Sequence, residues 1–199
     1  MKRIITALFF GLSLLLASGG ISYSADFEKG AAAYVEGDYA IALQEFSALA
    51  EQGNAPAQTA LGLMYQNGDG VLQDYKEAAK WYRIAAEYGN VLAQHNLGWM
   101  YSNGNGVLQD DKQALNWYRK SAKQGYAVAQ LKIGIMYYQG NGALQDNIYA
   151  HMWLNIAASN GNTDAAEARD IIAERLTTSD MSKAQELARE CVAKNYKGC

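Results

Sequence analysis

The sequence of 199 residues has no excess of positive charge, since 17 lysines and arginines face 20 aspartates and glutamates. A protein that binds nucleic acid through its phosphates needs a basic stripe or patch to neutralise them. None is present, so nucleic acid is not an expected partner. Proline is nearly absent, with Pro56 alone, and half of the residues are hydrophobic. The chain therefore has enough apolar material for a well-buried domain and shows no sign of disorder.

Long apolar runs are also scarce, and the one candidate is at the N-terminus. Lys2 and Arg3 precede the apolar residues 4–17, and small residues predominate over 18–25. This run is short for a membrane span, which needs about 20 apolar residues, and the order of the three parts is typical of a secretory signal peptide. We expect residues 1–25 to be a signal peptide, cleaved between Ser24 and Ala25 or after Ala25, with an uncleaved anchor as the alternative. No later segment is expected to enter a membrane.

Cysteine and histidine are limited to two residues each. In an exported chain, Cys191 and Cys199 predict a disulfide that closes a nine-residue loop and contributes about 2–3 kcal/mol. No further ligands lie near them, so a metal site is not expected. His95 and His151 belong to no G-x-S-x-G or H-E-x-x-H motif, and His151 is expected on a solvated helix face. The sequence therefore predicts no catalytic residue, no cofactor and no metal.

What the sequence does contain is a repeat with a period of 36 residues. A fixed period of this length predicts a stack of small units, each of which buries its apolar face only against its neighbours. Such a stack offers a long surface and needs no active site, so binding is the expected role. Two glycines, a tyrosine and a tryptophan recur at fixed phases: Gly62, Gly98 and Gly134; Tyr65, Tyr101 and Tyr137; Trp81, Trp117 and Trp153; Gly89, Gly125 and Gly161.

Each unit is predicted to be a pair of helices. In residues 54–89, apolar residues at helical spacing indicate a first helix that breaks at Gly68 and Gly70. Asp74 can cap a second helix, and Gly89 can end it. Recurring glycines and alanines allow the helices to approach closely, and the tryptophans are expected to fill the core. The loop resembles a calcium site only weakly, because Asp69 has asparagine at its phase in the other copies, and turn formation explains it.

The units at the two ends differ from the three full copies, as the ends of a stack should. The first pair has a tight turn in place of the longer loop, and the last pair closes the stack. We expect ten helices in five antiparallel pairs, divided after the signal peptide into residues 26–53, 54–89, 90–125, 126–161 and 162–199.

The motifs resemble a known family. Ala-Leu-Gly-x-x-Tyr at 60–65, the run from Gly68 to Trp81 and Ala-Ala-x-x-Gly at 85–89 are similar to the Sel1-like repeat, a relative of the tetratricopeptide repeat with a longer loop. Three copies match, over residues 54–161, and residues 26–53 resemble a tetratricopeptide unit. The resemblance implies an all-α, right-handed α-solenoid. It also implies an adaptor that holds protein complexes or recognises peptides and, for an exported bacterial member, a periplasmic or secreted location.

Positions that vary between the copies are free to serve a partner. On the first helix these positions lie at spacings of four and three, and so share one face. In the tetratricopeptide arrangement that the family resembles, this face lines a concave groove, although the same side chains could simply pack on neighbouring helices. The predicted groove for an extended peptide or protein segment consists of Thr59, Leu63, His95, Trp99, Asn103, Ile135 and Tyr138. An envelope hydrolase and a purely structural part of an envelope assembly are the alternatives.

Overall fold

The computed structural model describes residues 26–199, so the predicted signal peptide lies outside the described residues. Within this range the chain forms ten α-helices and no strand, as the repeat predicts. The helices are α1 (Phe27–Glu36), α2 (Tyr39–Glu51), α3 (Ala55–Asn67), α4 (Tyr75–Glu87), α5 (Val91–Asn103), α6 (Asp111–Ala122), α7 (Ala127–Gln139), α8 (Asn147–Ser159), α9 (Thr163–Ala173) and α10 (Thr178–Ala193).

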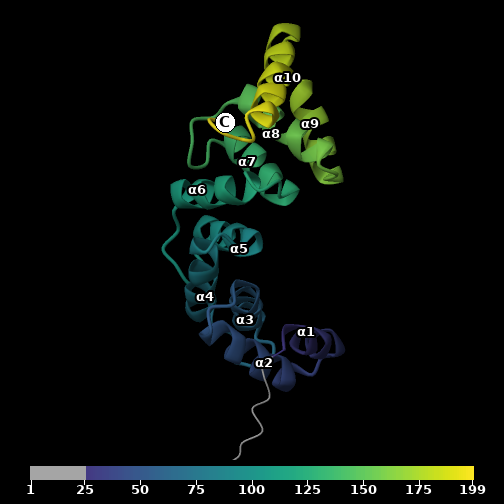
Figure 1. Ribbon diagram of the computed structural model, residues 1–199. Helices are drawn as coiled ribbons and strands as arrows, with labels where there is room; N and C mark the ends of the chain where they lie inside the picture. Colours follow the sequence, from purple (N-terminus) through teal and green to yellow (C-terminus); the bar gives the residue numbers. More distant parts are fainter. Residues whose placement is uncertain (1–25) are drawn as a thin grey trace, which may run out of the picture.

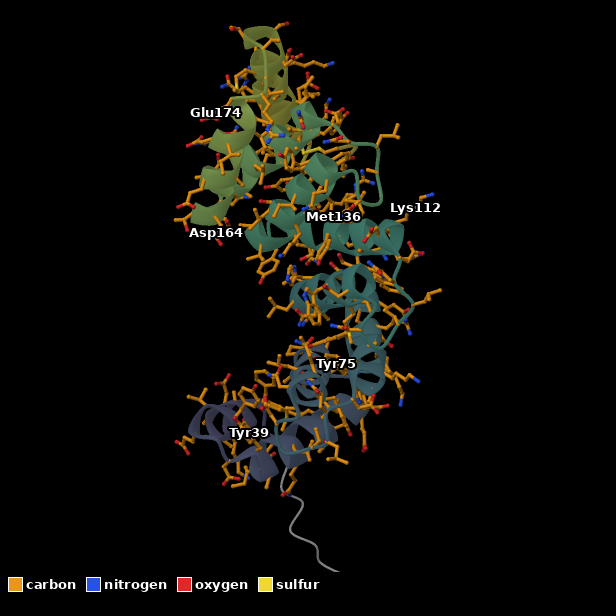
Figure 2. The ribbon with its side chains drawn as sticks, turned by 180° about the vertical axis from the view of Figure 1, so that it is seen from behind. Tyr39, Tyr75, Lys112, Met136, Asp164 and Glu174 are labelled. Atoms are coloured by element: carbon orange, nitrogen blue, oxygen red, sulfur yellow. A yellow bond between two sulfur atoms is a disulfide. The ribbon has the colours of Figure 1, made fainter. Side chains whose placement is uncertain are left out.

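The helices stack in chain order into an elongated, curved body, in which α1 and α9 project to the same side with α3 and α5 between them (Figure 1). Helices α1 to α8 pack mainly on the helices that precede and follow them. Tyr39, Tyr75 and Lys112, near the starts of successive second helices, lie at successive levels of the stack (Figure 2). The last pair is more open than the others, because α9 and α10 both pack on α8.

Caps at the helix ends follow the predicted pattern. Asp74 accepts hydrogen bonds from the backbone N–H groups of Lys76 and Glu77, and the equivalent Asp110 and Asp146 cap α6 and α8 in the same way. A carboxylate at this place satisfies donors that the helix leaves unpaired and interacts favourably with the helix dipole. Gly89 has a φ of +89°, in the left-handed region that a helix-ending glycine adopts.

The mid-helix glycines allow close contact within each unit. A Cβ atom at Gly62 would lie 2.8 Å from the ring of Tyr82, and one at Gly98 would lie 2.8 Å from the ring of Tyr118. These glycines are therefore required by packing, which outweighs their cost in a helix interior of about 1 kcal/mol relative to alanine.

The loop glycines join each unit to the one before it. Gly106 has a φ of +71°, and a Cβ atom there would overlap the backbone carbonyl of Tyr75 at the start of α4. Gly142 approaches the backbone of Asp111 at the start of α6 in the same way. In the second and third full repeats, the loop thus packs directly on the backbone of the preceding second helix. This contact cannot be read from the sequence, because it is made by backbone atoms.

A buried glutamine provides a second connection between units. The Nε2 atoms of Gln58, Gln94 and Gln130 donate to the carbonyl oxygens of the preceding second helices at 3.0 to 3.1 Å. These carbonyls lie in the last turn of a helix, where no backbone donor is available within the helix, and each also accepts from the backbone N–H of the glycine three residues on, at 2.9 to 3.1 Å. The glutamine therefore caps the helix of the neighbouring unit.

One member of this glutamine series has an unpaired oxygen, and the defect predicts a stabilising substitution. The Oε1 atoms of Gln94 and Gln130 accept from side-chain amides 30 residues further on, each at 2.8 Å, whereas the Oε1 of Gln58 is buried without a partner. Tyr88 stands at the corresponding phase and is 77% exposed. We expect Tyr88→Gln to raise the free energy of unfolding by about 0.5–1.5 kcal/mol, because it supplies the missing donor.

The control for Tyr88→Gln is Tyr88→Ala, which removes the same ring without adding a donor. Urea denaturation of the two variants at neutral pH measures the difference. If Tyr88→Gln is no more stable than Tyr88→Ala, the interpretation of the unpaired oxygen is wrong.

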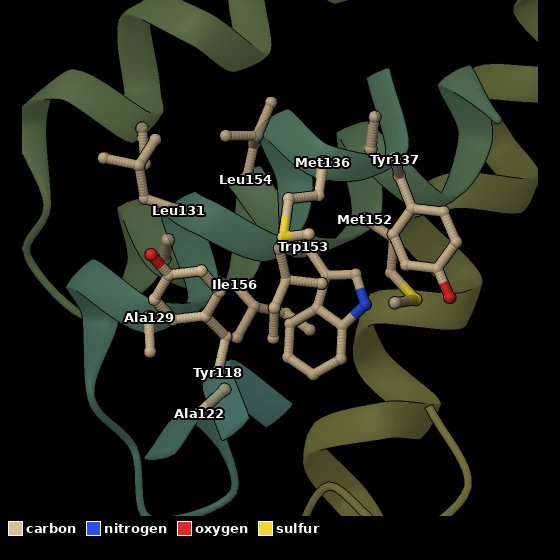
Figure 3. Close-up of a cluster of buried hydrophobic side chains, with 14 of the residues drawn as sticks. Tyr118, Ala122, Ala129, Leu131, Met136, Tyr137, Met152, Trp153, Leu154 and Ile156 are labelled. Atoms are coloured by element: carbon tan, nitrogen blue, oxygen red, sulfur yellow. The ribbon is translucent and has the colours of Figure 1, made fainter. Parts of the chain in front are cut away.

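The tryptophans lie in the core, although not equally deeply. Trp153 is 1% exposed and packs in the C-terminal core with Met136, Met152 and Tyr137 (Figure 3). Trp117 is 8% exposed, and Trp81 is half-buried against the N-terminal core. The prediction that the tryptophans serve packing is therefore confirmed, with Trp81 the least buried of the three.

Candidate partner-binding surface

The residues predicted to form one groove lie in two different environments. In the middle of the stack, His95 of α5 packs between the rings of Tyr118 and Tyr126, with ring centroids 5.4 and 5.3 Å away. Burial lowers the pKa of His95 to about 4, and the positive charge of Lys132 adds to the shift. His95 is therefore neutral at physiological pH and serves as a packing residue between α5, α6 and the start of α7.

This environment predicts a loss of stability in acid. The pKa of His95 is about 4 in the folded protein against an ordinary value of 6.5, so the unfolded chain takes up a proton first as the pH falls. The contribution of neutral His95 to the free energy of unfolding is complete above the unfolded pKa and is lost as the pH falls from 6.5 to 4. The loss amounts to roughly 1–3 kcal/mol. We expect His95→Leu, which introduces the residue found at this phase as Leu131, to flatten the pH dependence.

Urea denaturation of the protein and of His95→Leu at pH 7 and pH 4.5 provides the measurement. His151 and Glu45 also reduce the stability of the folded protein in acid, since burial lowers the pKa of His151 and the hydrogen bond from Lys29 lowers that of Glu45. The difference between the two proteins isolates His95. Equal losses of stability in both would contradict the assignment.

The predicted groove residues nearer the C-terminus also have structural neighbours. Trp99 is half-buried against the middle and C-terminal cores, and Ile135 packs on the C-terminal core. The guanidinium of Arg175 lies over the ring of Tyr138, 5.1 Å from its centroid. Asn103 is exposed, and its Nδ2 donates to the backbone oxygen of Trp99 at 2.7 Å. These side chains are held in place by the protein itself.

Thr59 and Leu63, in contrast, line an open cavity on the concave side of the stack. The cavity has a volume of about 450 Å³ and lies between α1, α3 and α5. A neighbouring cavity of about 210 Å³ shares Phe27, Ala60 and Leu63 with it. We call the two together the α1–α3–α5 trough, lined by Phe27, Ala31, Tyr34, Val35, Phe46, Pro56, Thr59, Ala60, Leu63, Asn90, Leu92 and Asn96.

The trough is apolar, and none of its lining residues carries a charge. Thr59 uses its hydroxyl to donate to the carbonyl of Ala55 at 2.8 Å. Asn90 uses its Oδ1 to accept two backbone N–H groups at 3.0 Å, which leaves its Nδ2 as a donor at the rim. A cavity of this size with few polar groups suits apolar side chains, while the rim amide suits a backbone carbonyl.

The α1–α3–α5 trough contains Thr59 and Leu63 of the predicted groove, together with Phe27 and Leu92, which the prediction did not name. Phe27 lies in the atypical first pair, outside the 36-residue register. Leu92 is 46% exposed, and its phase is apolar in every full copy, as Pro56 and Val128 show. The sequence did contain a signal for Leu92, because an apolar residue recurs at a position of the repeat that packing does not bury.

A second apolar feature lies on the loops, which protrude on the side away from the opening of the curve (Figure 1). Leu72, Leu108 and Leu144 share one phase of the repeat and are 90–91% exposed. We call these three residues the leucine ridge. Their near-complete exposure shows that packing within the chain does not require them.

The polar loop beside the ridge is structural. The carboxylate of Asp69 accepts from the hydroxyl of Tyr34 at 2.6 Å and from Nδ2 of Asn67 at 3.0 Å, so it links the first repeat to the pair before it. Burial, together with the hydrogen bond to Asp69 and the negative charge of that carboxylate, raises the pKa of Tyr34 to about 12. Over residues 26–199, no three His, Cys, Asp or Glu side chains gather as a metal site would require.

At the C-terminal end of the stack, the predicted disulfide is present, but His151 is not where it was expected. Cys191 and Cys199 form a disulfide with their Cα atoms 5.7 Å apart. His151 is 3% exposed, so the prediction of a solvated face is wrong. The reason is that both helices of the last pair fold over α8. None of the helices described is long and apolar enough to span a bilayer.

Comparisons with known proteins agree with this architecture. The Sel1 repeat matches three times, over residues 55–90, 91–126 and 127–162. Among solved structures, the chain is similar to a Sel1 repeat protein from Oxalobacter formigenes, with 39% identity and a TM-score of 0.59 over 64% of this chain and 96% of that one. No curated protein matches the sequence.

The chain is also similar to c5321, described as a protective antigen present in uropathogenic Escherichia coli strains and displaying an SLR fold. The identity is 29% and the TM-score 0.59, over 78% of this chain. The match covers 42% of c5321, so this chain spans less than half of the length of that protein.

Proposed function

The chain belongs to the Sel1 repeat family, whose members generally act as protein-interaction scaffolds, and from this premise we propose that it is a non-catalytic adaptor. Its partner is an extended peptide or protein segment held in the α1–α3–α5 trough. The observation that carries the proposal is the trough itself, an uncharged cavity of about 450 Å³ on the concave side of the stack.

The chemistry of the trough defines the partner segment. Apolar side chains of the segment fill the space beside Phe27, Leu63 and Leu92, and Asn90 donates to its backbone. Because the trough is lined by helices that are already packed, binding orders few protein side chains and loses little free energy to reorganisation. A charged side chain in the segment would be buried there without a partner, which disfavours acidic and basic segments.

We place the adaptor in the bacterial envelope or outside the cell. The predicted signal peptide supports export, and the disulfide between Cys191 and Cys199 is of the kind that persists in oxidising compartments. The description of c5321 as an antigen applies to that protein and is compatible with the same location.

A matched pair of variants tests the trough. Peptides are selected for binding to residues 26–199, and the affinity of one selected peptide is measured by calorimetry for the protein, for Leu63→Asp and for Leu108→Asp. We expect Leu63→Asp to weaken binding at least tenfold, because it places a carboxylate in the apolar trough. Leu108→Asp makes the same change on the leucine ridge and should leave the affinity unchanged. Unchanged binding to Leu63→Asp would overturn the proposal.

The leucine ridge favours a second candidate function, a structural part of an envelope assembly that is held through the loops. Exposed leucines are ordinary singly, but three at one phase form a repeated apolar feature. In that case Leu108→Asp would weaken assembly and Leu63→Asp would not. A hydrolase has no comparable support, because neither histidine bonds to a serine, threonine or cysteine among the described residues.

A further inference from the structure

The last junction of the stack, between α8 and α9, departs from the repeat where the other junctions build their core. The phase of Arg169 is occupied in the earlier copies by Leu61, Leu97 and Ile133, none of which is more than 3% exposed. The phase of His151 is occupied by Ala79 and Leu115, which are 2% and 3% exposed. Two apolar core positions have therefore become polar at one junction.

A second departure at the same place creates space. In the two preceding junctions, Arg83 donates to the hydroxyl of Tyr101 at 3.1 Å, and Arg119 donates to the hydroxyl of Tyr137. One period further along, the arginine phase holds Asn155 and the tyrosine phase holds Ala173. Both partners are shortened together, so the volume that an arginine and a tyrosine fill elsewhere is not filled here.

A cavity of about 260 Å³ occupies this position, and its walls come from three helices. Met181 and Gln185 of α10 contribute to it, so the closing helix forms one wall of this open cavity and the junction forms the others. The full lining is His151, Asn155, Arg169, Asp170, Ala173, Met181 and Gln185.

The polar groups of the cavity are only partly satisfied within the chain. His151 is 3% exposed, and its Nδ1 is buried without a hydrogen-bond partner. The Nε and Nη2 atoms of Arg169 donate to Oδ1 of Asp170 at 2.9 and 2.7 Å, whereas Nη1 reaches Oδ1 of Asn155 only at 3.4 Å. A buried polar atom without a partner costs about 1–3 kcal/mol, which a leucine at the same phase avoids.

We propose that this cavity is a second binding site, which takes a carboxylate group, either the C-terminal carboxylate of a peptide or that of a free amino acid. The guanidinium of Arg169 can pair with the carboxylate through Nη1, and Asn155 and Gln185 offer amide donors. Met181 and Ala173 provide an apolar wall for a small side chain. A volume below the roughly 300–1,000 Å³ of drug-sized sites limits the ligand to about one residue.

The alternative ligands are less well matched. Asp170, with its side chain 69% exposed, lines the cavity but is paired with Arg169, so the cavity has no excess of negative charge for a cation. An inorganic anion would pair with Arg169 but would leave the apolar wall unused.

The test uses N-acetyl-Gly-Ala as the free acid, the same dipeptide as its C-terminal amide, free alanine and inorganic phosphate. Binding is followed by NMR through the side-chain N–H signals of Arg169, Asn155 and Gln185. We expect saturable shifts with the free acid, a dissociation constant of about 1 mM or tighter, and binding at least tenfold weaker for the amide. Stronger binding of the dipeptide than of alanine identifies a peptide terminus, and the reverse identifies a free amino acid.

Two variants complete the test. Arg169→Gln should weaken binding of the free acid at least tenfold. Arg83→Gln, the same change at a junction without the cavity, should leave this binding unchanged. Because Arg169→Gln could also disturb folding, the double variant Asn155→Arg/Ala173→Tyr restores the pair of the other junctions and should abolish binding in a folded protein. Equal binding of acid and amide, phosphate binding as strong as that of the acid, or full binding by the double variant would overturn the proposal.

Discussion

Gly106→Ala is expected to lower the free energy of unfolding by about 4 kcal/mol. The new Cβ atom would overlap the backbone carbonyl of Tyr75, which belongs to a helix of the preceding unit and cannot rotate away as a side chain does. The left-handed φ of +71° adds about 1–2 kcal/mol for any residue with a Cβ atom. The two units must separate locally to accommodate the methyl group, so the substitution acts on the contact between repeats.

Gly125→Ala is the control, since Gly125 has a φ of +86° but a Cβ atom added there would meet no other atom within 4 Å. It should cost about 1–2 kcal/mol, the conformational part alone. Chemical denaturation of both variants gives the comparison. A loss for Gly106→Ala no greater than that for Gly125→Ala would show that the loop does not rest on the preceding helix.

The second large effect is expected at Trp153. Trp153→Ala should destabilise the protein by about 3–5 kcal/mol, because the indole is 1% exposed and its removal leaves a cavity in the C-terminal core. Trp81→Ala should cost clearly less, because Trp81 is half-buried at the edge of the N-terminal core.

A third variant separates the ring from its polar atom. The Nε1–H group of Trp153 is buried without an acceptor, so Trp153→Phe removes an unpaired donor together with part of the ring. We expect it to cost under about 2 kcal/mol. Thermal unfolding followed by circular dichroism measures all three. Similar losses for Trp153→Ala and Trp81→Ala would mean that the recurring tryptophans are equivalent, contrary to their burial.

The helices and their caps were predictable because their causes are local. Asp74 and Gly89 act within one turn of the chain, and the 36-residue period reports the stack directly. Contacts across units are less visible. The sequence shows that Gly106 recurs, but only the approach of the Tyr75 backbone shows why alanine cannot replace it. Gln58 was overlooked because a recurring glutamine gives no apolar signal, although it lies in the core.

The candidate site was harder to predict, because equal phase does not give equal surroundings. Thr59 and His95 share a phase, yet Thr59 borders an open cavity and His95 is enclosed by Tyr118 and Tyr126. The difference comes from the neighbouring units. Phe27 of the first pair lines the cavity beside Thr59 without filling it. Tyr126, at the start of the third repeat, instead fills the space beside His95. The location of the trough follows from this irregularity at the end of the stack.

Site-specific photocrosslinking in the native cell tests the central claim most directly. A photoreactive phenylalanine is placed at position 63 in the trough and, in a separate protein, at position 108 on the leucine ridge, and the crosslinked peptides are identified by mass spectrometry. The trough as the partner-binding surface predicts that position 63 crosslinks to one uncharged, apolar segment of a partner, and that position 108 does not capture it. Capture of the partner at position 108 alone would contradict it.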